Sequence, residues 1–594
     1  CFCKNFIMLC GTGIGMREEG SGRKFENLAE TAIIVAFFAA ILFLGPASAS
    51  EHKIKHDYPV GYGASDSYQH QSRAEAIKNL GQYRNEASYM MSGLKVVGFY
   101  PPLLYHDTVL LSHLSGLETY DALFLIVGMV LALAAAVIYY LTKSLGKPAA
   151  MLGLPLTLFI TTGKPFLGLV TFGQMPVALS SLFLAATALA ITKLDLPKSY
   201  FLVAMAFSGT IMAHTSESLF LAIMMAVIFG SLIIGKVVLA KDRLNGLKTI
   251  LRENRALLIG FALATALTLY FWPLFIGIWL KMQQYKFGIE TISASFPAAT
   301  VFPTEFGFMF FAVIIGIIAA VLFAVQKRKE LGKLLNSPKL FTLAFSFYMV
   351  LVGLGTYAGF GLRSFQTRLF WPITLAPLAG FGLYQLLRII LTLLAPVSKG
   401  IAKGVSTFAA AAVSTAVLGF VIFSTYYSEP STGSMDRDHW EAMRWVAENT
   451  PKDAEVYVLF SYAYSQTSVL YNTERVNYFL EFSEFVKIIN SISEKGSFDR
   501  ETLVSIAADS GAGFPYRKGL LSFGQQSKES PIKLDMCNAD YYVIDTAFPQ
   551  QAQTLAQVNL YLQQKFMQAN MTVEYQNQWV KVLKNSNRGG DCIA

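Results

Sequence analysis

The chain has 594 residues, of which 54% are hydrophobic and 15% are charged, with a formal net charge of +9. Soluble domains carry about 25% charged residues, so this composition is typical of a protein built for a lipid environment. The positive charge does not indicate a nucleic-acid partner, because Lys and Arg cluster in short links between apolar runs, at 240–255 and 326–335. Basic links of this kind are typical of cytoplasmic loops.

Residues 1–29 are predicted to form a cytoplasmic N-terminal segment. It opens with CFCKNFIMLC, whose cysteine spacing does not suit a metal and has no nearby His. We expect the stretch CFCKNFIMLC to be an upstream extension, and Met8 and Met16 are both plausible first residues of the protein. The apolar run 30–48 ends in ASAS like a signal peptide, but it is longer than a signal core, which favours an uncleaved first helix.

A membrane-spanning helix needs about 20 apolar residues. The sequence offers about eleven such segments, which place a transmembrane domain at 30–425. They lie near 30–48, 121–142, 149–163, 175–193, 199–214, 216–239, 256–279, 307–326, 340–358, 369–391 and 404–425. With the basic links inside, the N-terminus is cytoplasmic and an odd number of spans puts the C-terminus outside the cell membrane. No charge lies at the middle of a clear span, which argues against an ion pathway.

Three segments are then exoplasmic, namely the long first loop 49–120, the loop 280–306 and everything after 426. Within the first loop, residues 67–84 and 100–117 are each predicted to form an amphipathic helix at the membrane interface. Residues 426–594 have soluble composition and predict an α/β domain.

That domain begins with a predicted helix at 436–450, followed by strands at 455–460 and 540–545. It also contains Cys537 and Cys592, whose pairing the sequence leaves open. Asn570-Met-Thr is a sequon on the predicted outer face and a candidate glycan acceptor.

The first loop gathers Asp66, Tyr68, His70 and Arg73 in the pattern D-x-Y-x-H-x-x-R. Asp66 stands at the start of a predicted helix, where a carboxylate caps backbone N–H groups. It can equally be a catalytic carboxylate held at the level of the lipid headgroups, with His70 and Arg73 on the following turns. Both roles stay open, and one residue can fill both.

The order of these features resembles the GT-C superfamily of polytopic membrane glycosyltransferases. The resemblance is to the archaeal branch related to the catalytic subunit of oligosaccharyltransferase. It rests on the first helix, the acidic first loop, YPPL at 100–103, RLFWPITLAPLAGFGL at 368–383 and DRDHWEAMRWVAENTPKDAEV at 436–456.

The resemblance implies an enzyme that uses lipid-phosphate-linked sugars, with Asp66 as the catalytic or metal-binding carboxylate. It also implies that Arg368, with Arg363 beside it, contacts the lipid-linked phosphate, since a guanidinium pairs bidentately with phosphate. The alternative for both arginines is a snorkelling role at a helix end. The opening of the C-terminal domain matches the family's helix at four positions, Trp440, Trp445, Thr450 and Pro451.

The sequence departs from oligosaccharyltransferases at three places. LFSYAYSQ (459–466) stands where those enzymes carry WWDYG, and the loop 161–174 lacks their second acidic pair. Ala294 of TISA replaces a glutamate. Because divalent metal sites need several oxygen ligands, no metal or cofactor is assigned, and transfer to Asn sequons is not expected.

Two further residues are weaker candidates for the site. Asp107, after His106, either assists Asp66 or simply faces water. His214, close to Glu217, either lines the site or ends a helix through one hydrogen bond.

The sequence therefore predicts a glycosyltransferase that moves a sugar from a polyprenyl or dolichyl phosphate to a protein or glycan acceptor on the outer face. Asp66 would be its general base. The alternative is a non-catalytic scaffold or partner-binding subunit that keeps the fold. The sugar, the acceptor and the protein partners cannot be named from the sequence.

Overall fold

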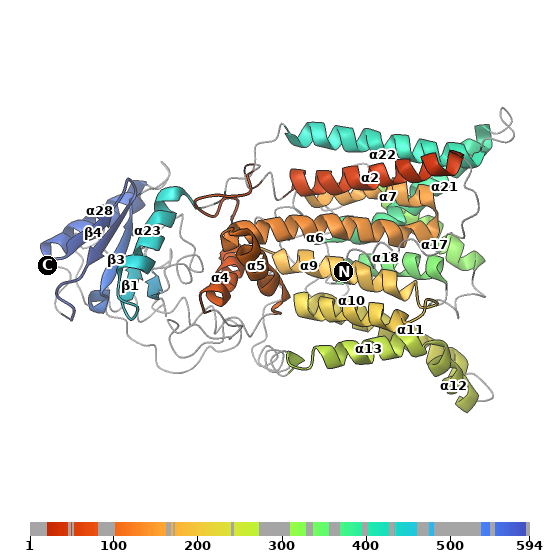
Figure 1. The fold of residues 1–594 in the computed structure, drawn as a ribbon, viewed down its shortest axis with the longest axis horizontal. Coiled ribbons are helices and arrows are strands. Elements are labelled where there is room, and N and C mark those ends of the chain that lie inside the picture. The colour runs from red at the N-terminus through yellow and green to blue at the C-terminus, as the bar shows by residue number, and fades with distance from the viewer. Residues whose placement is uncertain are drawn as a thin grey trace.

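The computed structural model describes residues 21–45, 49, 51, 53–63, 65–80, 101–161, 168–169, 173–238, 243–272, 309–327, 335, 337–355, 369–394, 402–426, 433, 435–459, 475–479, 536–546 and 553–589. Figure 1 shows a bundle of helices with a β-sheet beyond one of its ends. We call this the sheet-facing end and the other the far end.

A helix is present in each of the eleven apolar segments of the sequence. These helices are α2 (Ser21–Leu44), α6 (Thr119–Thr142), α7 (Lys147–Thr157), α9 (Met175–Ile191), α10 (Ser199–Ala213), α11 (Thr215–Ile233), α13 (Arg255–Leu267), α17 (Met309–Gln326), α18 (Pro338–Leu354), α21 (Ala376–Leu394) and α22 (Ala402–Tyr426). Among the described residues, five helices are long and apolar enough to cross a membrane, and six further apolar helices are shorter. The number of crossings stays a prediction.

Short elements continue the bundle helices at several of their ends. They are η1 (Lys143–Leu145), η2 (Leu158–Thr161), η4 (Ile234–Val238), α12 (Arg243–Glu253) and α20 (Trp371–Thr374). Helix α12 lies at the far end (Figure 1) and belongs to the basic link 240–255.

Small residues let the bundle helices approach closely. A Cβ atom added to Gly380 of α21 would lie 2.1 Å from the carbonyl oxygen of Ala149 in α7, and one on Gly316 of α17 would lie 2.0 Å from that of Leu378. Only glycine allows such backbone contact. At the far end, Glu30 of α2 accepts from Lys143 at 2.5 Å and is paired with Lys147 at 2.8 Å, which ties the first helix to the start of α7.

Two helices of the first loop lie between the bundle and the sheet (Figure 1). They are α4 (Ser65–Leu80), which begins before the predicted stretch 67–84, and α5 (Leu103–Ser115), which lies within the predicted stretch 100–117. Residues 81–100 lie outside the described part. Ala74 and Ile77 of α4 pack on Tyr105 and Val109 of α5. Gly116 ends α5 in the left-handed conformation, with φ of 70°.

The C-terminal region contains a five-stranded sheet with the strand order β2-β1-β3-β5-β4. Its strands are β1 (Glu455–Val458), β2 (Val476–Phe479), β3 (Tyr541–Asp545), β4 (Thr572–Gln576) and β5 (Val580–Lys584). β1 pairs in parallel with β2 and β3, whereas β5 pairs antiparallel with β3 and β4. The accompanying helices are α23 (Arg437–Asn449), α28 (Gln553–Gln568) and η8 (Met536–Asn538).

Two sequence features of this region can be placed. Cys537 is disulfide-bonded, and its partner lies outside the described residues, where Cys592 also lies. Asn570 of the sequon is exposed in the turn between α28 and β4, with φ of 65°.

The sheet region meets the bundle through aromatic and hydrogen-bonded contacts. The ring of Tyr120, at the start of α6, packs edge-on against Trp440 of α23, with centroids 5.5 Å apart. The Tyr120 hydroxyl donates to the carbonyl oxygen of His56 at 2.9 Å, and the His56 ring bonds Asp121 at 2.6 Å. The first loop is therefore fastened to α6 at the point where α23 contacts it.

His439 predicts a pH dependence of the sheet region. Its Nδ1 lies 2.7 Å from Asp436 and its Nε2 lies 3.0 Å from Asp545, and the side chain is 2% exposed. Burial lowers the pKa of His439, but the two carboxylates outweigh it and raise the pKa from 6.5 to about 9.

A raised pKa contributes stability that is complete below the unfolded value of about 6.5 and is lost as the pH rises through about 9. We expect the free energy of unfolding to fall by on the order of 3 kcal/mol between pH 6 and pH 10. His439→Gln should remove most of this slope in thermal unfolding at several pH values. An unchanged slope in the variant would contradict this role for His439.

Candidate active site

Helix α4 carries the polar residues of the first loop to the face of α5. The Tyr105 hydroxyl lies 2.8 Å from Nδ1 of His70 and accepts a hydrogen bond from Nη1 of Arg73 at 3.1 Å. The His70 ring stacks on Tyr105 with centroids 5.8 Å apart, and the Arg73 guanidinium lies 5.8 Å from the same ring. Residues 70, 73 and 77 follow the helical period, which explains why they share one face.

The bundle contributes a second buried pair beside this group. The ring of His214, the residue before α11, is hydrogen-bonded to the carboxylate of Glu217 in the first turn of that helix. Glu217 is fully buried, and within the described part of the chain its Oε1 has no hydrogen-bond partner. We call His70, Arg73, Tyr105, His214 and Glu217 the polar cluster.

The surroundings of His70 fix its charge state. Burial lowers the pKa of His70 well below its usual value, and the nearby Arg73 and His214 lower it further. A hydrogen bond to the Gly173 backbone acts in the opposite direction without reversing the shift. His70 is therefore neutral near pH 7, so Arg73 is the cation that α4 contributes to the cluster.

Asp66 lies on the same face of α4 by its position. Helix α4 begins at Ser65, so Asp66 falls within the first turn and not before the helix. Position 66 is one turn before His70 and two turns before Arg73, which places it on the face that carries them. A carboxylate in a first turn is favoured by the helix dipole, so the structural and catalytic roles both remain predictions.

Tyr68 and Asp107 are the other candidates that the first loop contributes. Tyr68 is fully buried and donates through its hydroxyl to the carbonyl oxygen of Tyr62 at 3.1 Å, so its described contacts are with the chain before α4. Asp107 is half-buried on α5, and burial raises its pKa to about 6. Their roles at a site stay predictions.

Arg363 and Arg368 lie outside the described residues, but the next residue along the chain, Leu369, is placed. Its side chain packs against Gly168, where an added Cβ would lie 2.4 Å from Leu369 Cδ2. The carbonyl oxygen of Gly168 accepts from the N–H of Gln174 at 3.0 Å, next to Gly173, which bonds His70. A short series of contacts therefore connects Leu369 to the polar cluster.

Comparison with known proteins bears on the whole arrangement. No protein-family profile and no curated protein matches the sequence. Among solved structures, the apo oligosaccharyltransferase of Archaeoglobus fulgidus is similar over 94% of this chain and 75% of its own, with a TM-score of 0.53 and 12% identity. This chain has the GT-C fold.

Two further structures of the Archaeoglobus fulgidus enzyme agree with this result. The complex with Zn and sulfate is similar over 93% of this chain and 73% of its own, with a TM-score of 0.53 and 13% identity. The complex with an inhibitory peptide and a dolichol-phosphate is similar over 95% of this chain and 75% of its own, with a TM-score of 0.52 and 12% identity. The resemblance inferred from the sequence is thus confirmed at the level of the fold.

In this GT-C fold, the described residues contain no group of three or more His, Cys, Asp or Glu that could hold a metal ion. His214 and Glu217 are two side chains that could bind a metal ion, and the side chain of Asp66 is not among those described. The described residues therefore do not include a complete set of ligands for a divalent metal ion.

Sequence reasoning missed two members of the polar cluster. Tyr105 precedes the His106-Asp107 pair that drew attention, and its contacts to α4 span 32 and 35 residues of sequence. Glu217 was noted only as a neighbour of His214. A carboxylate in the first turn of an otherwise apolar helix was the available signal, because burying such a group needs a local reason.

Tyr105→Phe tests whether the cluster is a connected unit. Removing the hydroxyl takes one hydrogen-bond partner from both Arg73 and His70, which are buried, so we expect a loss of about 1–3 kcal/mol in the free energy of unfolding. Tyr200→Phe on α10 is the matched control, because no hydrogen bond of its hydroxyl is described, and it should change stability by less than about 0.5 kcal/mol. If the two variants lose the same stability in thermal unfolding, the Tyr105 hydroxyl does not stabilise the polar cluster.

Proposed function

We propose that the protein is a membrane glycosyltransferase that takes a sugar from a polyprenyl-phosphate donor, such as dolichyl phosphate. The observation that carries this proposal is the buried polar cluster beside position 66, at the sheet-facing end of a GT-C-fold bundle. One similar structure, the oligosaccharyltransferase complex, holds a dolichol-phosphate. An amphiphilic donor would present its phosphate at the level of the membrane surface, where α4 and α5 lie between the bundle and the sheet.

The reaction is a displacement at the anomeric carbon. The acceptor oxygen forms a bond to that carbon as the bond between the carbon and the phosphate oxygen breaks. The acceptor hydroxyl gives its proton to Asp66, and the electron pair of the broken bond leaves with the lipid phosphate. A general base contributes typically 10²–10⁴ in rate, which is the role proposed for Asp66.

Fixed cations would stabilise the charge that develops on the leaving phosphate. Arg368, with Arg363 nearby, is proposed as the bidentate phosphate contact, and the packing of Leu369 on Gly168 supports its nearness to the polar cluster. Arg73 adds a cation that Tyr105 holds in position at 3.1 Å. His70 is neutral and would act through hydrogen bonding rather than charge.

The acceptor is proposed to be a protein or glycan on the outer face of the cell membrane. A peptide is bound in one similar oligosaccharyltransferase structure. Because LFSYAYSQ replaces the WWDYG sequence, we do not propose transfer to Asn sequons. In this proposal the sheet region and the first loop are extracellular and the N-terminus is cytoplasmic, which agrees with the basic helix α12 at the far end.

A non-catalytic scaffold that keeps this fold is the second candidate. It is favoured by the loop 161–174, which has no carboxylate where oligosaccharyltransferases carry an acidic pair, and by Ala294 in place of a glutamate. A scaffold would still need the polar cluster to be buried and connected, but it would not need the carboxylate of Asp66.

The orientation can be tested by cysteine labelling in intact cells. A cysteine at the exposed position Glu574 of β4 should react with an impermeant maleimide, whereas one at Arg252 of α12 should react only after the membrane is opened. The wild-type protein gives the background from the five native cysteines. The reverse pattern would put the polar cluster on the cytoplasmic side and overturn the proposed placement of the reaction.

Asp66→Asn separates catalysis from helix stabilisation. Asparagine has nearly the shape of aspartate but cannot accept the proton, so transfer from a polyprenyl-phosphate sugar should fall by about 10²-fold or more. Loss of a first-turn charge should cost no more than about 1 kcal/mol of helix stability. Glu75→Gln, on the same helix, is the matched control and should leave transfer within about twofold, because its bond from the Thr119 hydroxyl survives the change.

Thermal unfolding measured in parallel should show Asp66→Asn to be folded. Asp66→Ala should lose a similar amount of rate and, like Asp66→Asn, no more than about 1 kcal/mol of helix-dipole stabilisation. If Asp66→Asn is folded and as active as the wild type, Asp66 is not the base.

Arg368→Lys tests the phosphate contact. A lysine keeps the charge but loses the planar pair of donors, so we expect use of the donor to weaken about tenfold or more. Arg252→Lys, at an exposed position of the far end, should leave it unchanged. Titration of the donor into each purified variant measures its apparent affinity. If Arg368→Lys and Arg252→Lys have the same affinity for the donor, Arg368 is a membrane anchor and not a phosphate contact.

A further inference from the structure

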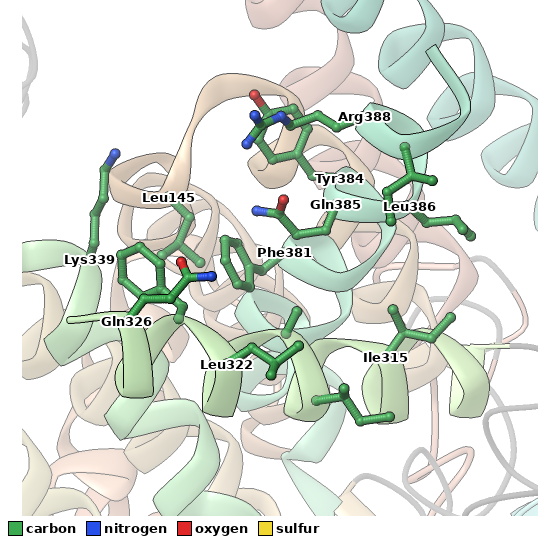
Figure 2. Close-up of a pocket in the computed structure, with 14 residues that line it drawn as sticks. Leu145, Ile315, Leu322, Gln326, Lys339, Phe381, Tyr384, Gln385, Leu386 and Arg388 are labelled. Atoms are coloured by element: carbon green, nitrogen blue, oxygen red, sulfur yellow. The ribbon is translucent and has the colours of Figure 1, made fainter. Parts of the chain in front are cut away.

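A pocket lies at the far end of the bundle, away from the polar cluster. It is a cavity of about 570 Å³ between α17, α18 and α21 (Figure 2), bordered by Leu145 of η1. This volume falls within the range of ligand pockets in proteins, which is about 300–1,000 Å³. None of its lining residues belongs to the proposed active site.

One part of the pocket is apolar. It is lined by Ile315, Ile318 and Leu322 of α17 and by Phe381, Leu386 and Ile389 of α21. Both helices are long and apolar enough to cross a membrane. Ile318, Leu322 and Ile389 are 55%, 58% and 58% exposed, so this wall opens outward toward the surroundings of the bundle. In a membrane those surroundings are hydrocarbon chains.

The other part of the pocket is polar and cationic. Lys339 stands at the start of α18, Arg388 lies near the end of α21, and Gln326 ends α17. Figure 2 shows Lys339 and Gln326 at one end of the pocket and Ile315 at the other. The lining includes no Asp or Glu, and neither Lys339 nor Arg388 is paired with a carboxylate within the described ranges.

Arg388 is also held in place without being neutralised. Its guanidinium lies 6.0 Å from the ring centroid of Tyr384, another lining residue one turn earlier on α21. Stacking on an aromatic ring leaves the N–H groups of an arginine available to an anion. The pocket thus has a cationic part and an apolar part, which one amphiphilic ligand could contact together.

We propose that this pocket binds an anionic membrane phospholipid. One hydrocarbon chain would lie along the wall made by α17 and α21, and the phosphate would contact Arg388 and Lys339. A guanidinium binds phosphate oxygens bidentately, and the ammonium of a lysine adds a point charge. A soluble phosphate would gain nothing from the apolar wall, which is the reason for choosing a lipid.

The basic links of the sequence agree with this choice. Helix α12, from the link 240–255, and Gln326, at the start of the link 326–335, lie at the same end as the pocket. Both links carry the charge pattern of cytoplasmic loops. Anionic lipids give the cytoplasmic leaflet its negative surface potential. The site would therefore be filled from the leaflet opposite to the one that presents the sugar donor.

The test compares two lipids with the same chains and different headgroups, anionic phosphatidylglycerol and zwitterionic phosphatidylcholine. Each is titrated into the purified full-length protein in detergent and counted by native mass spectrometry. We expect preferential retention of phosphatidylglycerol, and Arg388→Gln should weaken its apparent affinity about tenfold. Arg252→Gln, an exposed arginine of α12 at the same end that does not line the pocket, should change it less than about twofold.

A second variant tests the oily part without changing charge. Ala319→Phe would fill the pocket beside α17 and should also lower phosphatidylglycerol retention, with Ala319→Leu as the smaller change if the first variant does not fold. Equal losses at Arg388 and Arg252 would show general surface charge instead of a site. Binding that survives both Ala319 variants, or no preference between the two lipids, would also overturn the proposal.

Discussion

The arrangement at the sheet-facing end depends on how a buried arginine is accommodated. Arg73 is 3% exposed, and an ion taken out of water costs several kcal/mol unless fixed dipoles replace its hydration. The Tyr105 hydroxyl is one such dipole, and it binds His70 at the same time. This contact and the packing of Ala74 and Ile77 on Tyr105 and Val109 join α4 to α5. A buried cation next to a neutral histidine is an arrangement suited to a negatively charged ligand.

The elements could be predicted from the sequence, while the contacts between them could not. The apolar runs and the basic links predicted the helices of the bundle, because a long apolar stretch has few other stable structures. The pattern of Asp66, His70 and Arg73 was visible because those positions share a helix face. The same period could have shown that Tyr68 points elsewhere, and the structure buries it against Tyr62.

The meeting of Tyr105, Glu217 and the Gly173 backbone could not be predicted from sequence patterns, although the place of Glu217 in an apolar helix indicated a local role. They come from segments distant in sequence, and their meeting depends on how α4, α5 and α11 pack. Nothing in the local sequence of Tyr105 distinguishes a tyrosine that bonds a buried arginine from one that fills a core. The pocket between α17 and α21 could not be predicted for the same reason, since in the sequence Lys339 and Arg388 each resemble an ordinary cation near a helix end.

The shared fold and the reaction rest on different grounds. At 12% identity, the likeness to the oligosaccharyltransferase of Archaeoglobus fulgidus concerns the path of the chain. The chemistry has to be argued from the residues, and here they supply a carboxylate position, a held arginine and a segment carrying two more arginines. The absence of the WWDYG sequence and of the second acidic pair points away from sequon transfer, but the sequence keeps Asp66, the proposed base, and Arg368, the proposed phosphate contact.

The central claim is that a lipid-linked phosphate binds at the sheet-facing end, beside the polar cluster. The most direct measurement is an experimental structure of the purified protein with a polyprenyl phosphate bound. The account predicts the phosphate next to Arg368 or Arg73, with the first carbon position of the sugar facing Asp66. A phosphate bound only in the pocket between α17 and α21, or none bound at the sheet-facing end, would contradict it.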